Sequence, residues 1–303
     1  MPAEFSRPSD KGMFCLAGDA VSCLSDADID ALIREDLGGD DLTTRTLAIG
    51  ARAGRMQFRA RQPMVAACLP EAARMLERLG CGTRCLAEPG VVLAAGTPLL
   101  EARGSAASLH AGWKSAQTLV EWASGIATAT RALVDAARTA RPDIAVHCTR
   151  KTAPMTRALA ARAVLAGGGE IHRRGLFDTV MLFPEHRAFL DRPADIAAAV
   201  AALRRRLPER AIMVEVVTET EALAAAEAFV DVIQLEKFTP EAAARVVAAV
   251  VRRPDGRPVI AAAGGVTAAN ASAYAASGVD VLVTSAPYYA PPQDVQVTIL
   301  PNT

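Results

Sequence analysis

Apolar residues recur at helical spacing close to the start of the chain. Ile29 and Leu32 would lie on one face of a helix from about Asp26 to Glu35. Ser25 precedes this segment as a suitable N-cap, and Asp28 stands at the third helical position, as in a capping box. The pattern therefore predicts a first helix with a well-defined start.

Between residues 55 and 104 the apolar pattern changes between a period of two and a helical period. Met56 to Arg61 alternates as a strand, Glu71 to Leu79 is helical, and clusters of proline and glycine separate further short strands. This mixture predicts a small antiparallel sheet with a helix. A long helical stretch follows from about Ala107 to Ala140, and Gly125 leaves open whether it forms one helix or two.

From residue 144 onward, short β-branched runs alternate with alanine-rich helical segments, which predicts a parallel sheet. An open, incomplete α/β barrel fits better than a doubly wound sheet, because unusual residues follow nearly every strand instead of one switch point. A run from Gln296 to Leu300 is expected to rejoin the N-terminal sheet. The predicted barrel strands are Ile144–Cys148, Thr179–Phe183, Ile212–Val217, Val232–Leu235, Val259–Ala262 and Val279–Val283.

Composition narrows the class of protein. The chain has 303 residues, enough for two domains, and its 33 Lys and Arg balance its 33 Asp and Glu. This balance gives no long-range field for nucleic acid or an anionic membrane, so we expect neither partner and only local recognition of small anions. The 6 cysteines form no Cys-x-x-Cys pair, which favours reduced, packed thiols over a metal site. Residues 1–21 resemble a disordered tail and not an export signal, so a cytoplasmic protein is expected.

Polar and charged residues gather where the predicted barrel strands end. In a parallel barrel these ends meet on one face, where the βα-loops build binding sites. The residues at or just after these ends are Thr149, Arg150, Lys151, Glu185, His186, Glu215, Glu236, Lys237, Gly264, Gly265, Thr284 and Ser285.

Two neighbouring ends have the features of a phosphate site. Gly264 and Gly265 stand between a strand and a helix, where backbone N–H groups can approach an anion and the helix N-terminus adds positive charge. Thr284 and Ser285 would add hydroxyl groups from the adjacent loop. Phosphate sites on barrels favour these last two loops, so we prefer a phosphate site to an ordinary turn.

Cations are concentrated in two other loops. Residues 167–174 read Gly-Gly-Gly-Glu-Ile-His-Arg-Arg, a run that is also typical of a solvated basic loop. Together with Arg150 and Lys151, this run favours an anion site, because arginine makes bidentate contacts and lysine supplies a point charge.

Acidic residues accompany these cations. Glu215 and Glu236 would hold hydroxyl groups, Mg²⁺ or a cationic intermediate, or would form surface ion pairs with residues such as Lys237. His186 fits either a functional or a packed histidine.

Several motifs together resemble those of the quinolinate phosphoribosyltransferase family, also called carboxylating nicotinate-nucleotide pyrophosphorylases. The resemblance runs from about Leu24 to Ile299 and is closer still to a sister group, ModD, found with molybdate transport genes. The motifs are Glu35-Asp36-Leu37-Gly38, Asp41-Leu42-Thr43-Thr44, Ser124-Gly125-Ile126-Ala127-Thr128, Thr149-Arg150-Lys151, Gly167-Gly168-Gly169 with His172-Arg173, and Ala263-Gly264-Gly265.

This resemblance implies an N-terminal α/β sandwich domain and an open α/β-barrel domain. The expected bounds are 22–123 for the sandwich, joined by a C-terminal strand within 290–303, and 124–289 for the barrel. It also implies a homodimer in which the sandwich of one subunit caps the barrel of the other. Lys114 stands where the family has an arginine that reaches across the dimer to the substrate, and Trp113 and Trp122 would either anchor this interface or fill the seam between the domains.

The resemblance further implies roles for individual residues. The residues implied to hold the acid substrate and the diphosphate are Arg150, Lys151, His172 and Arg173. Those implied to face the ribose of phosphoribosyl pyrophosphate, with Mg²⁺, are Glu215 and Glu236, and those implied to hold its 5′-phosphate are Gly264, Gly265 and Ser285.

The chain departs from the family where the acid would bind. Phe183 replaces a family lysine, Glu185 alters the stretch after it, and Glu236 with Lys237 replaces an aspartate and an asparagine. Gln234 belongs to the same ModD-like pattern. We therefore expect the phosphoribosyl half of the site to be kept and the acid-binding half to be altered.

The main hypothesis is a Mg²⁺-dependent phosphoribosyltransferase that joins phosphoribose to an aromatic nitrogen and releases pyrophosphate. Two alternatives stay open. One is a non-catalytic phosphate or nucleotide binder serving molybdate transport or cofactor metabolism, which Phe183 favours. The other is an aldolase-like barrel with Lys151 as a Schiff-base lysine. Glu215 and Glu236 favour the transferase, because a pure anion binder gains nothing from them.

Overall fold

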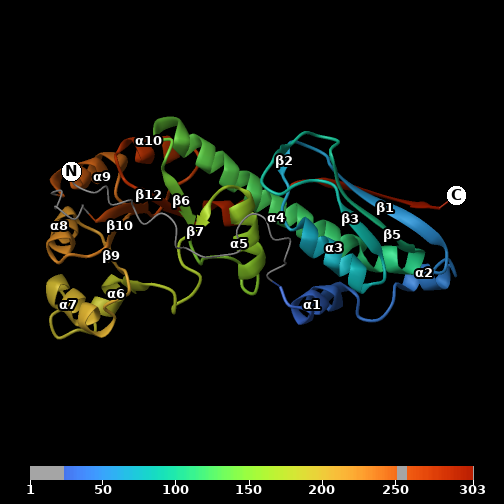
Figure 1. Ribbon diagram of the computed structural model, residues 1–303, viewed down its shortest axis with the longest axis horizontal. Helices are drawn as coiled ribbons and strands as arrows, with labels where there is room; N and C mark the ends of the chain where they lie inside the picture. The colour runs from blue at the N-terminus through green and yellow to red at the C-terminus, as the bar shows by residue number, and fades with distance from the viewer. Residues whose placement is uncertain (1–23, 251–257, 303) are drawn as a thin grey trace, which may run out of the picture.

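The computed structural model describes residues 24–250 and 258–302, so the predicted tail at 1–21 lies outside the described residues. Two main sheets stand towards opposite ends of an elongated molecule, and one long helix, α4, runs between them (Figure 1). The antiparallel sheet lies at one end and the parallel sheet at the other. Within these ranges no helix has the length and apolar character that a membrane span requires.

The N-terminal sheet is antiparallel, as the sequence predicts. Its order is β13-β1-β5-β3, so the last strand of the chain lies at its edge beside β1 and confirms that the C-terminal strand rejoins this sheet. Met56 and Phe58 point into the core, whereas Gln57 between them faces the open side. The strands are β1 (Ala53–Ala60), β3 (Gly82–Cys85), β5 (Pro98–Ser105) and β13 (Val295–Pro301), and a separate pair is β2 (Met64–Val65) with β4 (Val92–Leu93).

Helices cover the other side of this sheet. The first begins as predicted, because the Asp28 N–H donates to Ser25 Oγ at 3.2 Å while the Ser25 N–H donates to Asp28 Oδ2 at 2.9 Å. Ile29 on this helix is fully buried. The helices of this part are α1 (Asp26–Asp36), α2 (Leu42–Thr46) and α3 (Leu69–Arg78).

Helix α4 (Ala106–Ala140) is a single unbroken helix of 35 residues. Gly125 does not interrupt it. The glycine stands there because the returning chain passes too close to the helix for a side chain. A Cβ atom at Gly125 would lie 2.5 Å from the carbonyl oxygen of Pro291. The first half of α4 packs into the N-terminal core through residues such as Leu109, and the second half packs into the barrel core through Leu133.

Seven parallel strands form the second sheet, in the order β7-β6-β12-β11-β10-β9-β8. Strands β7 and β8 form its two edges and do not pair, so the barrel is open. Strand β7 was not predicted and lies within the glycine-rich loop. The strands are β6 (Ala145–Cys148), β7 (Glu170–Ile171), β8 (Val180–Leu182), β9 (Ile212–Val216), β10 (Val232–Glu236), β11 (Val259–Ala263) and β12 (Val281–Thr284).

The two faces of the parallel sheet differ in character. Residues such as Val214, Ile233 and Leu235 belong to a large core that also contains apolar residues of the surrounding helices. The other face, inside the half-barrel, carries small residues such as Ala261 and Ala263. Glu215 and Gln234 lie on this same face, opposite each other on β9 and β10. The surrounding helices are α5 (Arg157–Ala166), α6 (Pro184–Arg187), α7 (Ile196–Arg206), α8 (Glu219–Glu227), α9 (Pro240–Ala249), α10 (Ala271–Ala276) and the 3-10 turn η1 (Ala286–Tyr289).

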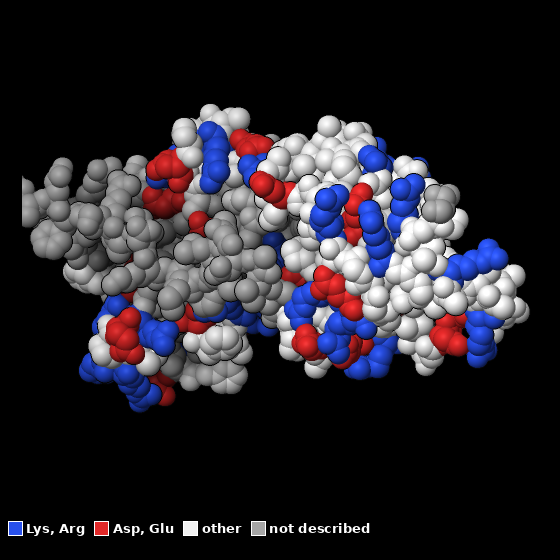
Figure 2. Space-filling view, turned by 45° about the vertical axis from the view of Figure 1, so that its right-hand side comes forward, with Lys and Arg blue, Asp and Glu red and all other residues white. Residues whose placement is uncertain are grey.

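Charge is mixed over the face of the N-terminal domain that Figure 2 shows. Acidic and basic side chains alternate there, and neither sign dominates this face. Ion pairs join several charged side chains of this domain, such as Arg84 with Glu101 at 3.1 Å and Arg74 with Asp26 at 2.5 Å.

Candidate active site

The carboxyl ends of the parallel strands bring most of the predicted site residues to one edge of the half-barrel. The register of neighbouring strands shows how closely these ends align. Glu236 lies opposite Ala263, the residue before the glycine turn, and Thr284 lies opposite Cys148, the residue before Thr149. Loops that are distant in sequence therefore meet at one mouth.

The loop after β6 is joined to the loop after β12. Thr149 Oγ1 lies 2.5 Å from Ser285 Oγ, and the Lys151 N–H donates to Thr149 Oγ1 at 3.2 Å. The hydroxyl of Tyr288 donates to the Thr149 carbonyl oxygen at 2.7 Å. These bonds fix the backbone from which the side chains of Arg150 and Lys151 extend, and they place Ser285 at the same point.

The two glycines after β11 have different surroundings although both have positive φ, +83° for Gly264 and +93° for Gly265. A Cβ atom at Gly264 would lie 2.8 Å from the Lys237 backbone nitrogen and 2.9 Å from Glu236 Oε1. At Gly265 none of the described residues beyond its two chain neighbours places an atom within 4 Å of the Cβ position. Gly264 thus lets the ends of β10 and β11 approach, whereas Gly265 borders open space, as a phosphate-binding turn requires.

Two parts of the predicted phosphate site have other roles in the structure. The buried hydroxyl of Thr284 donates to the Val266 carbonyl oxygen at 2.6 Å and so supports the turn from within the chain. Helix α10 begins only at Ala271, and Asn270 bonds the Gly265 carbonyl oxygen through its side chain at 3.0 Å. The expected helix N-terminus therefore does not directly follow the glycines, and the backbone of the turn is what remains for an anion.

Arg173 is a buried cation without an acidic partner. Its side chain has no hydrogen bond or ion pair with any residue in the described ranges, and only 7% of the residue is exposed. Burial, and then the charge of Arg150, lowers the pKa of Arg173. Its guanidinium carbon lies 5.3 Å from the centre of the Phe183 ring. The charges of Asp178 and Glu215 raise its pKa, but neither carboxylate bonds the guanidinium, so its hydrogen-bond donors are available to an anionic ligand.

His172 is held neutral beside Arg173. Burial is the main cause that lowers its pKa to about 4, and nearby His147, Arg173 and Arg150 act in the same direction. Its backbone N–H donates to the Cys148 carbonyl oxygen at 3.0 Å. The Nε2 atom is buried and finds no partner among the described residues. His172 thus offers a neutral hydrogen-bonding atom to a ligand.

Two carboxylates face the cations. Glu215 ends on the inner side of β9, where burial and then the charge of Glu236 raise its pKa, while a bond from Gln234 and the charge of Lys151 lower it. The bond is short, with Gln234 Nε2 2.7 Å from Glu215 Oε2. Arg173 also lies close enough for its pKa to respond to Glu215. The mouth therefore combines negative and positive groups within a partly buried site.

Gln234 bonds the predicted site residue Glu215, although the sequence alone indicates no role for it. It is buried in the middle of β10. The signal was present as one polar residue inside the apolar run Val-Ile-Gln-Leu-Glu.

The described residues contain no group of three or more His, Cys, Asp or Glu side chains arranged to hold a metal ion. Glu215 and Glu236 offer two carboxylates at the mouth. Mg²⁺ commonly uses one or two carboxylates together with substrate phosphates and water. The residues present therefore fit a Mg²⁺ ion that arrives with a phosphorylated ligand.

His186 is neither packed in a core nor turned towards a buried group. It is exposed, its Nδ1 accepts the Phe183 N–H at 3.1 Å, and its ring lies 5.6 Å from the Phe183 ring at an angle of 29°. It supports the start of α6 and the position of Phe183. Phe183 is therefore placed between Arg173 and His186.

Lys114 lies away from the barrel of its own chain, on the half of α4 that packs against the N-terminal sheet. It is exposed, with Nζ 4.2 Å from the Trp113 ring centre and 3.2 Å from Gln117 Oε1. Trp113 packs against the N-terminal core, and Trp122 packs against the core between the sheets. Both tryptophans are partly buried within the chain, which leaves part of each available to an interface.

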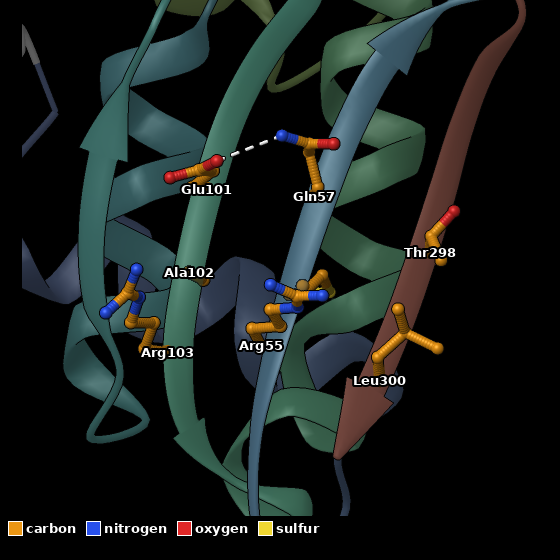
Figure 3. A pocket seen from close by; sticks show the side chains of 8 residues that line it. Arg55, Gln57, Glu101, Ala102, Arg103, Thr298 and Leu300 are labelled. Atoms are coloured by element: carbon orange, nitrogen blue, oxygen red, sulfur yellow. Dashed lines mark hydrogen bonds between the residues drawn. The ribbon is translucent and has the colours of Figure 1, made fainter. Parts of the chain in front are cut away.

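A cavity of about 250 Å³ lies elsewhere, on the open face of the N-terminal sheet (Figure 3). Arg55 and Arg103 stand opposite each other there on β1 and β5, and Gln57 donates to Glu101 at 2.9 Å. The residues that line this cavity are Arg55, Met56, Gln57, Glu101, Ala102, Arg103, Thr298 and Leu300. None of them is a predicted site residue, so this cavity is separate from the barrel mouth.

Comparison with protein families finds two matching models. Residues 41–124 match the N-terminal domain of quinolinate phosphoribosyl transferase, and residues 126–298 match its C-terminal domain. The two matches meet inside α4, close to Gly125.

Individual proteins agree with these matches. The chain is 51% identical over 249 residues to ModD of Rhodobacter capsulatus, which is named as a pyrophosphorylase. The aligned residues make up 82% of this chain and 95% of that protein. It is 35% identical over 274 residues to a Synechocystis protein named as a carboxylating nicotinate-nucleotide pyrophosphorylase, which covers 89% and 90%. Its fold is similar to the crystal structure of NadC from Streptococcus pyogenes, with a TM-score of 0.83, 26% identity, and 92% and 97% of the two chains covered.

Proposed function

The chain belongs to the quinolinate phosphoribosyltransferase family, and we propose that it transfers phosphoribose from phosphoribosyl pyrophosphate to a nitrogen atom of an aromatic acceptor. The observation that carries this proposal is the meeting of three features at one barrel mouth. These are the open backbone at Gly265, the carboxylates of Glu215 and Glu236, and the cations that include buried Arg173.

Each part of phosphoribosyl pyrophosphate has a matching group. The 5′-phosphate would lie against the open turn at Gly265, where no side chain intervenes. Ribose hydroxyl groups would donate to Glu215 and Glu236, because ionised carboxylates only accept hydrogen bonds. Arg150 and Lys151 would hold the diphosphate, and Glu215 and Glu236 would hold a Mg²⁺ ion, which would supply further neutralisation of the diphosphate charge.

The chemical step needs no covalent bond to the protein. The lone pair of the acceptor nitrogen forms a bond to C1 of the ribose, the bond from C1 to the diphosphate oxygen breaks, and its electron pair leaves with pyrophosphate. Positive charge develops on the ribose as this bond stretches. Glu215 and Glu236 would stabilise that charge, and Arg150 with Lys151 would stabilise the negative charge on the leaving group.

The acceptor-binding part points to an acid other than quinolinate. Arg173 would hold one acidic group, and neutral His172 would add a hydrogen bond without charge. The next position is the aromatic ring of Phe183, which offers an apolar contact where a second carboxylate would need a cation. The loss of one charge-assisted hydrogen bond costs about 1.5–3 kcal/mol. We therefore propose that quinolinate is a poor acceptor.

A non-catalytic binder of phosphates or nucleotides is the second candidate, and Phe183 is the observation that favours it. The two candidates differ in one measurable product. Titration calorimetry with Mg²⁺ and phosphoribosyl pyrophosphate tests binding, and release of pyrophosphate with a panel of aromatic nitrogen acids tests transfer. Binding with release supports the transferase, binding without release for any acceptor supports the binder, and absence of binding overturns both.

A further inference from the structure

The side-chain amide of Gln234 is only half used by the protein. The residue lies on β10, 4% exposed, with its Nε2 2.7 Å from Glu215 Oε2. Its Oε1 atom is buried and has no hydrogen-bond partner among the described residues. A buried acceptor without a partner is costly, so it needs an explanation in a native site.

Chemistry fixes which end of this amide faces Glu215. An ionised carboxylate can only accept hydrogen bonds, so the NH₂ group must point to it and the carbonyl oxygen must point away. The register of the sheet then shows what lies on each side. Gln234 stands between Glu215 on β9 and Ala261 on β11. Because an alanine side chain has no donor, the strand on the β11 side cannot satisfy Oε1.

The space near Oε1 belongs to the inside of the half-barrel. Ile233 and Leu235 point to the core formed with the helices, so Gln234 and Glu236 point to the opposite face. Ala261 and Ala263 on the neighbouring strand have short, apolar side chains and offer no hydrogen-bond donor to Oε1. The free oxygen is therefore on the same face of the sheet as the carboxylates of Glu215 and Glu236.

We infer that Gln234 is a further substrate-binding residue, whose Oε1 accepts a hydrogen bond from a hydroxyl group of the ribose of phosphoribosyl pyrophosphate. This inference rests on the proposed function. Glu215, Gln234 and Glu236 then form a row of acceptors for the ribose hydroxyls, and the Gln234 amide also holds Glu215 in place. A residue that met only packing needs at this position would be apolar, like its neighbours Ile233 and Leu235.

The test must separate direct contact from an effect through Glu215. Affinity for phosphoribosyl pyrophosphate with Mg²⁺ is measured by calorimetry for the wild type, Gln234→Met, Glu215→Gln and the double variant. Methionine keeps the size of the side chain and removes both polar atoms, and circular dichroism with thermal unfolding checks the fold. Gln57→Met is the matched control, because it breaks a similar Gln–Glu bond on the N-terminal sheet (Figure 3).

Direct contact predicts that Gln234→Met weakens binding about five- to tenfold, the effect of one lost neutral hydrogen bond, in both the wild-type and the Glu215→Gln backgrounds. Ribose 5-phosphate should show the same loss, and 2-deoxyribose 5-phosphate or its 3-deoxy counterpart should not. An effect that disappears in the Glu215→Gln background, or equal affinity in folded Gln234→Met, overturns the inference. If the wild type itself binds no phosphoribosyl pyrophosphate, the proposed function fails first.

Discussion

At the scale of single residues, a substitution at Gly265 should have two separate effects, one on the stability of the fold and one on the binding of phosphate. Its φ of +93° makes any side chain strained, although no atom of the described residues beyond its chain neighbours lies within 4 Å of its Cβ position. Gly265→Val should therefore cost about 1–2 kcal/mol of folding free energy and abolish binding of phosphoribosyl pyrophosphate, because the side chain would occupy the position of the phosphate oxygens. Calorimetry and urea unfolding measure the two effects separately.

Gly96 provides a matched control for this prediction. It has a φ of +81° and also has no atom within 4 Å of its Cβ position, but it lies in a turn of the N-terminal domain. Gly96→Val should lose similar stability and keep full affinity. Unchanged affinity in Gly265→Val would show that the glycine turn does not hold the phosphate.

His172 makes a second prediction at this scale, concerning pH. Its pKa is about 4 in the folded protein, below the ordinary value of about 6.5 for histidine. Between about pH 4 and 6.5, His172 therefore binds a proton in the unfolded chain but not in the folded protein. The stability contributed by neutral His172 is complete above about pH 6.5 and is lost as the pH falls towards 4, with a loss of about 2 kcal/mol by about pH 4.5.

Urea unfolding at neutral pH and at about pH 4.5 tests this linkage. His172→Gln should show a smaller decline in the free energy of unfolding than the wild type. Comparison of the two proteins isolates the contribution of His172, because every other titrating group is common to both. An identical decline in His172→Gln and the wild type would contradict the burial of neutral His172.

At the scale of secondary-structure elements, the open face of the N-terminal sheet contains an unfavourable pair. Arg55 and Arg103 are direct cross-strand neighbours, and neither forms an ion pair within the described residues (Figure 3). Like charges in this position are destabilising. Arg103→Glu should raise the free energy of unfolding by about 0.2–1 kcal/mol, because the new carboxylate would face Arg55.

The control for this substitution restores a repulsion between like charges, now between two carboxylates. Adding Arg55→Glu to Arg103→Glu should remove the gain in urea unfolding at low salt. A destabilised Arg103→Glu protein, or a gain that survives in the double variant, would show that the cross-strand charges do not act on each other.

The sequence predicts long elements better than short ones. The six predicted barrel strands and the C-terminal strand all appear, because each is an apolar run bounded by turn residues. Strand β7 has only 2 residues and pairs along one edge with β6, so it has too few side chains to produce a pattern. Gly125 misleads for another reason, since its role is a contact with Pro291, far along the chain.

For the candidate site, the sequence predicts which loops come together but not the hydrogen-bond partners of the individual side chains. The order of strands and polar residues is enough to gather the mouth, because parallel strands end on one edge. Sequence does not reveal where a hydroxyl donates, so Thr284 was expected to face a ligand although it bonds Val266. Sequence also does not reveal which buried polar atoms lack a partner. The unpaired Oε1 of Gln234 is therefore visible only in the structure.

At the scale of the whole molecule, the position of Lys114 suggests that one chain does not complete the site. This lysine is exposed on the half of α4 that packs into the N-terminal core, whereas Lys151 follows β6 of the parallel sheet. The two sheets stand towards opposite ends of the molecule (Figure 1). In the proposed homodimer, Lys114 would reach the barrel of the partner. Each of the variants Lys114→Ala and Lys151→Ala should then bind phosphoribosyl pyrophosphate weakly when it is present alone. A mixed dimer of the two should contain one intact site.

Unfolding the two variants together and refolding them should restore part of the binding of phosphoribosyl pyrophosphate with Mg²⁺. Lys114→Ala with itself is the control and should restore nothing. A monomer by light scattering, or no recovery in mixed dimers identified by two different affinity tags, would contradict a shared site.

The most direct measurement of the account is mass spectrometry of products formed from phosphoribosyl pyrophosphate, Mg²⁺ and a library of aromatic nitrogen acids. We predict that the wild type adds phosphoribose to an acid other than quinolinate, releases one pyrophosphate for each product, and converts quinolinate poorly. Glu215→Gln, which keeps the size of the side chain but removes its charge, should form the same product far more slowly. A wild type that binds phosphoribosyl pyrophosphate but transfers it to no member of the library would contradict the claim that this barrel is a transferase.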